Sequence, residues 1–172
     1  MDIKKQGFTL IELMVTLSVI AILASIAAPN FSEIIQNNRM ATQYNELLAS
    51  LSLARSEAVK RGVSTTVCKS DSGSSCGGNW HGGWVAFIDT DRDGVVDNSE
   101  EIVRIHSALS SGSSLVFARN RVTYDSDGLA TGFTGTFTLC DQRGDSNSKG
   151  LVVSNTGRVR QAIDTDNLAS CS

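Results

Sequence analysis

The sequence predicts an α+β fold, in which a long N-terminal helix packs on an antiparallel β-sheet. Three observations lead to this prediction. Residues 8–28 are almost continuously apolar, and an amphipathic pattern continues from there to about residue 61. Beyond residue 62, short β-rich runs alternate with Gly, Asn, Asp and Ser, the residues of turns. One helix followed by many consecutive strands is an α+β arrangement.

The apolar run of residues 8–28 is long enough to cross a bilayer. Its 21 residues, at about 1.5 Å each, give a helix of roughly 31 Å. Glu12 lies inside this run, where a carboxylate costs about 2.5–3.5 kcal/mol and points to a function. An ordinary secretory signal is disfavoured because such signals have shorter apolar regions. A plain single-span anchor is disfavoured because helical patterning continues past the run.

The amphipathic part of the helix follows Pro29. Proline removes a ladder hydrogen bond, so we expect a kink or a break at this position. Gly62, directly after Lys60 and Arg61, is typical of a helix C-cap. Apolar side chains recur at three- and four-residue spacing and need a sheet to cover them: Phe31, Ile34, Ile35, Tyr44, Leu47, Leu48, Leu51, Ala54 and Ala58.

The remainder of the chain supplies that sheet. Consecutive short strands joined by turn residues imply antiparallel hairpins. Residues 107–114 are the most loop-like stretch. The predicted strands are residues 63–68, 84–88, 101–105, 114–117, 122–124, 134–140, 151–154 and 159–163.

The string GFTLIEL, residues 7–13, resembles the processing site of type IV pilins and of the pseudopilins of type II secretion. The resemblance implies that a prepilin peptidase cuts between Gly7 and Phe8 and methylates the new amine of Phe8. The apolar helix then stays on the mature protein as its assembly element. In a fibre, Glu12 would face the amine of a neighbouring Phe8, because a buried charge is tolerable when it is paired. Thr9 completes the motif.

A second resemblance narrows the family. Residues 83–89 (GWVAFID), an Asp/Gly loop and residues 101–104 (EIVR) are similar to the GspH/FimT family of minor pilins and pseudopilins. With the long helix and the turn at residues 156–158, the resemblance extends over nearly the whole chain. It implies a type IV pilin-like fold and a non-enzymatic subunit, either a minor type IV pilin or, alternatively, a minor pseudopilin of a type II secretion system.

The family also implies an organisation and a location. Residues 1–7 would be the leader peptide, residues 8–28 the transmembrane and assembly helix, and residues 29–172 a periplasmic globular domain. Lys4 and Lys5 keep the leader cytoplasmic under the positive-inside rule. We expect a single-pass inner-membrane protein that moves into a pilus or pseudopilus at the cell surface. Its partners would be other major and minor pilins or pseudopilins, together with the prepilin peptidase.

An acidic loop follows the predicted strand 84–88. Residues 89–101 carry six carboxylates against one arginine. Their spacing matches a calcium-binding loop, with Gly94 at the turn position. The flanks are predicted strands and not the helices of an EF-hand, so a solvated acidic hairpin is the competing interpretation. Calcium is the only cofactor that the sequence suggests. Its ligands would be the carboxylates of Asp89, Asp91, Asp93, Asp97 and Glu100.

A basic motif lies at residues 157–160. Gly157 would turn the chain, and Arg158 and Arg160, two apart on a strand, would point to the same side. Paired guanidinium groups suit phosphate oxygens. This Gly-Arg-x-Arg string resembles the motif by which FimT-type minor pilins bind DNA during natural transformation. The resemblance implies double-stranded DNA as a partner, and Lys149 and Arg143 would widen the patch.

A structural interpretation of the same motif stays open. The arginines could be solvated, or could pair with Asp164 and Asp166 in an ordinary hairpin. The net charge of −3 argues against a protein that coats nucleic acid generally, although residues 143–160 form a locally basic stretch.

The four cysteines follow a secretory-type anchor and suggest an oxidising compartment. They allow three connectivities, which the sequence leaves open. We prefer Cys68–Cys76, which would close a local loop, and Cys140–Cys171, which would tether the tail. The sequence has no Cys-x-x-Cys spacing, nucleophile elbow or phosphate loop, so neither a zinc site nor an enzyme is predicted.

Overall fold

The structure is a computed structural model that describes residues 7–97, 99–163, 166 and 168–171. It divides into two compact units, Met1–Asn38 and Arg39–Ser172, which are described separately. The helix α1 (Leu10–Arg61) contributes its first part to one unit and its last part to the other.

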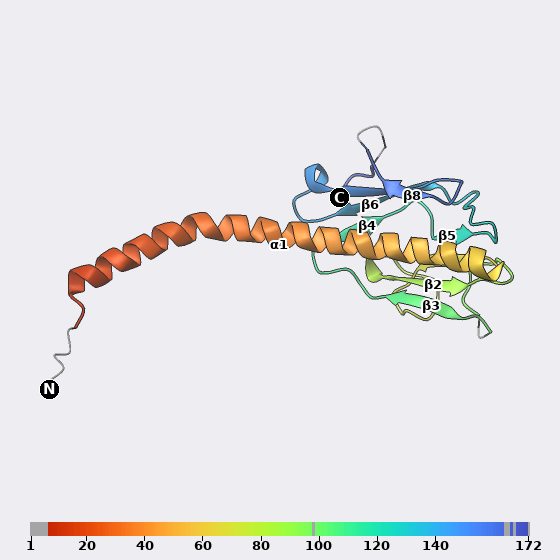
Figure 1. Cartoon of the computed structure of the whole chain (residues 1–172), viewed down its shortest axis with the longest axis horizontal. Helices are drawn as coiled ribbons and strands as arrows, with labels where there is room; N and C mark the ends of the chain where they lie inside the picture. The colour runs from red at the N-terminus through yellow and green to blue at the C-terminus, as the bar shows by residue number, and fades with distance from the viewer. Residues whose placement is uncertain (1–6, 98, 164–165, 167, 172) are drawn as a thin grey trace. The chain divides into compact units, whose positions relative to one another are not determined.

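The first unit contains the apolar part of α1 (Figure 1). The amide of Glu12 donates to Oγ1 of Thr9 at 3.3 Å, so Thr9 caps the start of the helix. Glu12 lies in the first turn, where a carboxylate complements the helix dipole. The apolar side chains of this part are exposed, and the helix is long and apolar enough to cross a membrane by length and composition.

The helix α1 continues through position 29. A break at Pro29, one of the two outcomes predicted from the sequence, is therefore wrong. Proline removes a single bond from the ladder, and a long helix can lose one bond without ending. The helix ends as predicted, because Gly62 has a φ of 69° and its amide donates to the carbonyl of Ala58 at 2.9 Å.

Among its described residues, the second unit holds eight strands, all within or beside the predicted runs, and every pairing between them is antiparallel. They form two four-stranded sheets. The first sheet has the order β3-β2-β1-β5, made of β3 (Ile102–His106), β2 (Trp84–Ile88), β1 (Thr65–Lys69) and β5 (Arg121–Tyr124). The second has the order β4-β6-β7-β8, made of β4 (Ser114–Val116), β6 (Gly135–Cys140), β7 (Lys149–Val153) and β8 (Val159–Gln161).

The division into two sheets corrects the single sheet expected from the sequence. Strand β5 follows β4 along the chain but pairs with β1, whereas β4 pairs with β6. The segment between β4 and β5 therefore carries the chain from one sheet to the other. Side-chain alternation indicates which face of a strand is buried, but it does not identify the neighbouring strand.

The core of the second unit forms where both sheets meet the last part of α1. Leu51, Ala54 and Ala58 of the helix are fully buried in one cluster with Val67 of the first sheet and Phe137 of the second. Figure 1 shows β2 and β3 on one side of this part of the helix and β6 and β8 on the other. The predicted stripe is thus covered from Tyr44 to Ala58. Its first three members, Phe31, Ile34 and Ile35, lie in the first unit and are exposed.

One buried hydrogen bond ties the helix to the first sheet. Nε1 of Trp84 donates to Oγ of Ser50 at 2.9 Å, and both residues are fully buried. We expect Ser50→Ala to lower the free energy of unfolding by about 1–3 kcal/mol, because the indole N–H would lose its acceptor. Ser52→Ala is the matched control on the exposed side of the same helix and should change it by less than about 0.5 kcal/mol. If denaturant titrations show equal losses of unfolding free energy for the two variants, the stabilising role of the Trp84–Ser50 hydrogen bond is contradicted.

Candidate functional site

The turn before β8 is fixed against the helix and a neighbouring loop. Gly157 has a φ of 71°, and a Cβ at this position would lie 1.9 Å from the carbonyl oxygen of Gly128. Arg55 of α1 donates through Nε to the carbonyl of Gly128 and through Nη2 to the carbonyl of Thr156, each at 3.0 Å. Gly157 therefore turns the chain as the motif predicts, and the turn has little freedom to move.

Arg158 follows this turn and is exposed. It lies one residue before β8 and not within the strand. Within the described part of the chain, its guanidinium group has no hydrogen-bond or ion-pair partner. Arg158 borders a hollow of about 550 Å³ between the turn and the last turns of α1, where Arg55 and Lys60 add two further cations. Neither residue was predicted as part of this site, because both lie on the helix, far from the motif in the sequence.

Arg160 lies in β8 and is held by a carboxylate. Its Nη1 and Nη2 donate to Oδ2 and Oδ1 of Asp166 at 2.7 and 2.9 Å. This bidentate contact lowers the pKa of Asp166 to about 2 and raises the pKa of Arg160. The folded pKa of Asp166 is depressed, so the pair is fully formed at neutral pH and is lost only as the pH falls towards 2. The expectation that Arg160 presents an open guanidinium group is thus corrected, and Asp164 lies outside the described residues.

Arg143 is also held within its own loop. It donates through Nε and Nη2 to Oδ2 of Asp141 at 2.9 and 2.5 Å, and both side chains are largely buried. The hydrogen bonds from Arg143 hold the pKa of Asp141 below its ordinary value. A side chain fixed in this way is oriented by its neighbour and not by an outside ligand.

Lys149 lies on the other face of the second sheet from Arg160. Lys149 shares one face of β7 with the buried Leu151 and Val153, whereas Arg160 pairs with Val152, whose side chain lies on the opposite face. The structure therefore does not bring the four predicted cations into one open patch. Of these four residues, Arg158 is the one whose exposed guanidinium group has no partner among the described residues.

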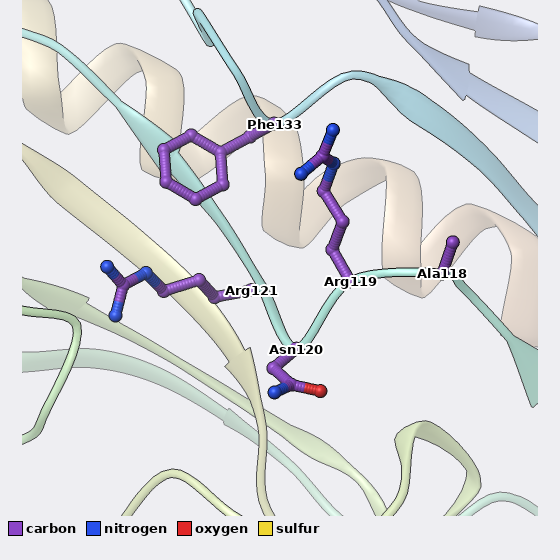
Figure 2. A pocket seen from close by; sticks show the side chains of 5 residues that line it. All are labelled: Ala118, Arg119, Asn120, Arg121 and Phe133. Atoms are coloured by element: carbon purple, nitrogen blue, oxygen red, sulfur yellow. The ribbon is translucent and has the colours of Figure 1, made fainter.

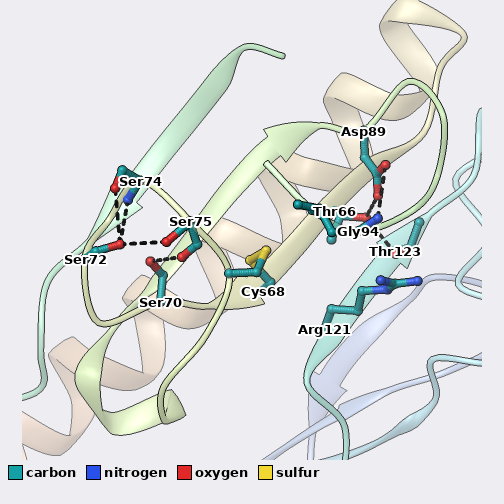
Figure 3. The surroundings of a disulfide bond; sticks show 12 residues. Thr66, Cys68, Ser70, Ser72, Ser74, Ser75, Asp89, Gly94, Arg121 and Thr123 are labelled. Atoms are coloured by element: carbon teal, nitrogen blue, oxygen red, sulfur yellow. Dashed lines mark hydrogen bonds between the residues drawn. A yellow bond between two sulfur atoms is a disulfide. The ribbon is translucent and has the colours of Figure 1, made fainter. Parts of the chain in front are cut away.

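Both disulfides join the pairs preferred from the sequence, Cys68–Cys76 and Cys140–Cys171. The first closes the loop after β1, where a network of serines lines the turn (Figure 3). The second ties the C-terminal tail to β6. The tail is also held by the amide of Ala169, which donates to Oγ1 of Thr138 at 2.9 Å. The Arg160–Asp166 pair belongs to this same attachment.

The acidic loop joins β2 to β3, and three of its carboxylates converge. Asp89, Asp91 and Asp93 each offer an oxygen within 4.8 Å of the others. This spacing suits one cation with ligands at about 2.3–2.6 Å. Asp89 is fully buried, and its Oδ2 accepts a hydrogen bond from Oγ1 of Thr66 at 2.5 Å (Figure 3). These three residues are the ones that could hold calcium.

The other two predicted ligands do not join this group among the described residues. The carboxylate of Glu100 accepts hydrogen bonds from the amides of Thr90 at 2.8 Å and Asp97 at 3.3 Å. It therefore caps the backbone of the hairpin. An ion pair between Arg92 and Asp125 also fixes the loop. The predicted set of five carboxylates is thus reduced to three.

Calcium binding at this loop stays a prediction that a melting experiment can test. With a Kd of about 10⁻⁴–10⁻³ M, typical of extracellular modules, calcium at about 10 mM should stabilise the protein by roughly 1.4–2.7 kcal/mol. The melting temperature should then be higher in calcium than in chelator. The double variant Asp91→Asn/Asp93→Asn should remove the difference. Identical melting temperatures for the unmodified protein in the two buffers would show that the loop is a metal-free hairpin.

The residues of the processing motif lie at the start of the first unit. Gly7 and Phe8 are exposed just before α1, and a Cβ at Gly7 would meet nothing within 4 Å. Glu12 is exposed in the first turn. These residues are accessible, as processing by a peptidase and pairing with another subunit would require.

Known proteins provide an independent comparison. The family described as type II transport protein GspH matches residues 43–157, and the prokaryotic N-terminal methylation motif matches residues 3–28. The fimbrial protein EcpB of Eikenella corrodens is 31% identical over 114 residues, which cover 66% of this chain and 58% of that protein.

Two solved structures share the fold. The type IV minor pilin FimU of Pseudomonas aeruginosa aligns with a TM-score of 0.62 at 21% identity, over 81% of this chain and 99% of that one. The minor pseudopilin EpsH of the type 2 secretion system of Vibrio cholerae aligns with a TM-score of 0.52 at 13% identity. This alignment covers 74% of this chain and 99% of that one. At these identities the likeness concerns the fold alone. Because the GspH model matches more than half of the sequence, the chain belongs to the GspH family of minor pilins and pseudopilins, and it begins with the prokaryotic N-terminal methylation motif.

Proposed function

We propose that this protein is a minor type IV pilin that is incorporated into a pilus or its tip complex and has no enzymatic role. The observation that carries the proposal is the exposed apolar part of α1 with Glu12 in its first turn. A prepilin peptidase would cut before Phe8, and the helix would hold the subunit in the inner membrane until assembly. A minor pseudopilin of a type II secretion system is the second candidate, supported by the fold shared with EpsH.

The position of Glu12 supports an assembly role. No ion pair to Glu12 is found within the described chain. A carboxylate in an apolar helix needs a cation once water is removed, and the free amine of Phe8 on a neighbouring subunit is a cation of the right kind. Only a correctly staggered neighbour places that amine near Glu12. The carboxylate therefore sets the register between subunits.

Replacing Glu12 tests the assembly role. We expect Glu12→Gln to leave the amount of protein in the membrane unchanged but to remove it from sheared fibres, because the amine of the neighbour would lose its counter-ion. Glu33→Gln is the matched control, since Glu33 is another exposed acid of the same helix, beyond the apolar run. Quantitative immunoblots of membrane and fibre fractions give the measurement. Equal incorporation of both variants would contradict the role of Glu12.

We also propose that the hollow beside Arg158 binds the phosphates of double-stranded DNA. Arg158 is exposed, and the turn that carries it is fixed by Arg55 and Gly157. Lys60 adds a charge whose side chain is 74% exposed and makes only a 3.5 Å contact with Glu57, so this ion pair is weak. A rigid turn that presents an open guanidinium group loses little freedom on binding a phosphate. Arg160 contributes less, because Asp166 occupies its donors.

Salt-dependent DNA retardation by the full chain in a neutral detergent tests this proposal. Arg158→Ala should weaken duplex binding regardless of sequence and reduce the slope of log affinity against log salt by about 0.9, the value for one phosphate contact. Arg160→Ala should have a smaller effect. Asp166→Asn should strengthen binding, because it would release Arg160 from its carboxylate.

Arg39→Ala is the charge-matched control, because Arg39 is an exposed arginine away from the hollow. Melting curves would verify that each variant is folded. No retardation of duplex DNA at low salt, or equal effects of Arg158→Ala and Arg39→Ala, would disprove DNA binding at this hollow.

A further inference from the structure

Two adjoining hollows lie where the chain passes from the second sheet to the first. The larger has a volume of about 390 Å³ and is lined by Ala118, Arg119, Asn120, Arg121 and Phe133 (Figure 2). The smaller, of about 220 Å³, shares Asn120 and Arg121 and extends to Lys69 and the Cys68–Cys76 disulfide. We refer to the surface formed by Lys69, Arg119, Asn120, Arg121 and Phe133 as the basic trough.

The basic trough carries three cations and no acidic side chain among its lining residues. Nε of Arg119 donates to the carbonyl of Thr134 at 3.2 Å, and Nη1 of Arg121 donates to the carbonyl of Asp93. Each guanidinium group is thus held by a neutral acceptor while its other N–H groups keep their donor capacity. Neither group has a carboxylate partner among the described residues. Oriented guanidinium groups of this kind suit phosphate oxygens.

The arginine at position 121 is held especially closely. A Cβ on Gly94 would lie 1.8 Å from its Nη1, so the guanidinium group packs directly on the backbone of the acidic loop. Pre-orientation of this kind lowers the entropy lost when a ligand binds. This contact could not be predicted from the sequence, because Gly94 and Arg121 are far apart along the chain.

An aromatic ring completes the trough. Phe133 is half-buried, and Cζ of Arg121 lies 5.7 Å from the centroid of its ring. Figure 2 shows the side chains of Arg119 and Arg121 on different sides of this ring. Proteins that bind single-stranded nucleic acid combine a cationic groove for the backbone with aromatic and arginine planes on which bases stack.

We propose that the basic trough binds single-stranded nucleic acid, with phosphates at the three cations and a base on Phe133. An acidic peptide would use the cations but would gain nothing from the ring. A duplex keeps its bases stacked on one another, so they cannot reach Phe133. This proposal goes beyond the proposed function, because it concerns a second surface and does not use Arg158.

Fluorescence anisotropy of a labelled oligothymidylate with the full chain in neutral detergent tests the proposal. Phe133→Leu keeps an apolar side chain but removes the stacking face, and it should weaken binding roughly 5- to 150-fold, the range for loss of one stacked base. Arg119→Ala should reduce the slope of log affinity against log salt by about 0.7, the single-strand value for one phosphate. Neither variant should change binding of duplex DNA.

The control variants separate this proposal from the duplex proposal. Leu129→Ala removes an exposed apolar side chain from the connection between β5 and β6, which also carries Phe133, and it should leave oligothymidylate binding unchanged. Arg158→Ala should weaken duplex binding only. The proposal is overturned if Phe133→Leu and Arg119→Ala, with unchanged melting temperatures, bind oligothymidylate as the unmodified chain does. It is also overturned if polyglutamate of equal charge displaces oligothymidylate as well as unlabelled oligothymidylate does.

Discussion

The second unit depends on one apolar stripe of α1 that both sheets cover. Leu51, Ala54 and Ala58 have no exposed surface, and side chains from each sheet contact them in a single cluster. Each of the two four-stranded sheets buries apolar side chains against this stripe, so helix and sheets share one core. Any loop that leaves either sheet therefore starts from a position fixed by the helix.

The same helix also fixes the charged surfaces. Arg55 follows the buried Ala54 in α1, and it donates hydrogen bonds to the carbonyls of Gly128 and Thr156 in two loops. Packing and site geometry are thus coupled, because a shift of α1 would move the turn that carries Arg158. The acidic loop shows a similar coupling, since its backbone supports Arg121 on the first sheet.

Periodicity and turn chemistry predicted most of the fold. The strands were found where β-rich runs alternate with turn residues, and Gly62 ends α1 because the left-handed conformation favours glycine. The pairing of β5 with β1 could not be predicted, because it depends on contacts between distant segments. The environment of the two arginines in the Gly-Arg-x-Arg motif was still harder to predict. Arg158 and Arg160 look equivalent in the sequence, but a carboxylate six residues beyond Arg160 holds only one of them.

Two of the attachments of the C-terminal tail differ in chemistry. The Cys140–Cys171 bond yields to a reductant but not to salt, whereas the exposed Arg160–Asp166 contact is weakened by salt but not by a reductant. With either tie broken, the other still keeps the tail near β6 and β8. The tail therefore keeps a strong attachment to the second sheet in any surroundings that are only reducing or only saline. Where both conditions coincide, it is held by hydrogen bonds such as that from Ala169 to Thr138.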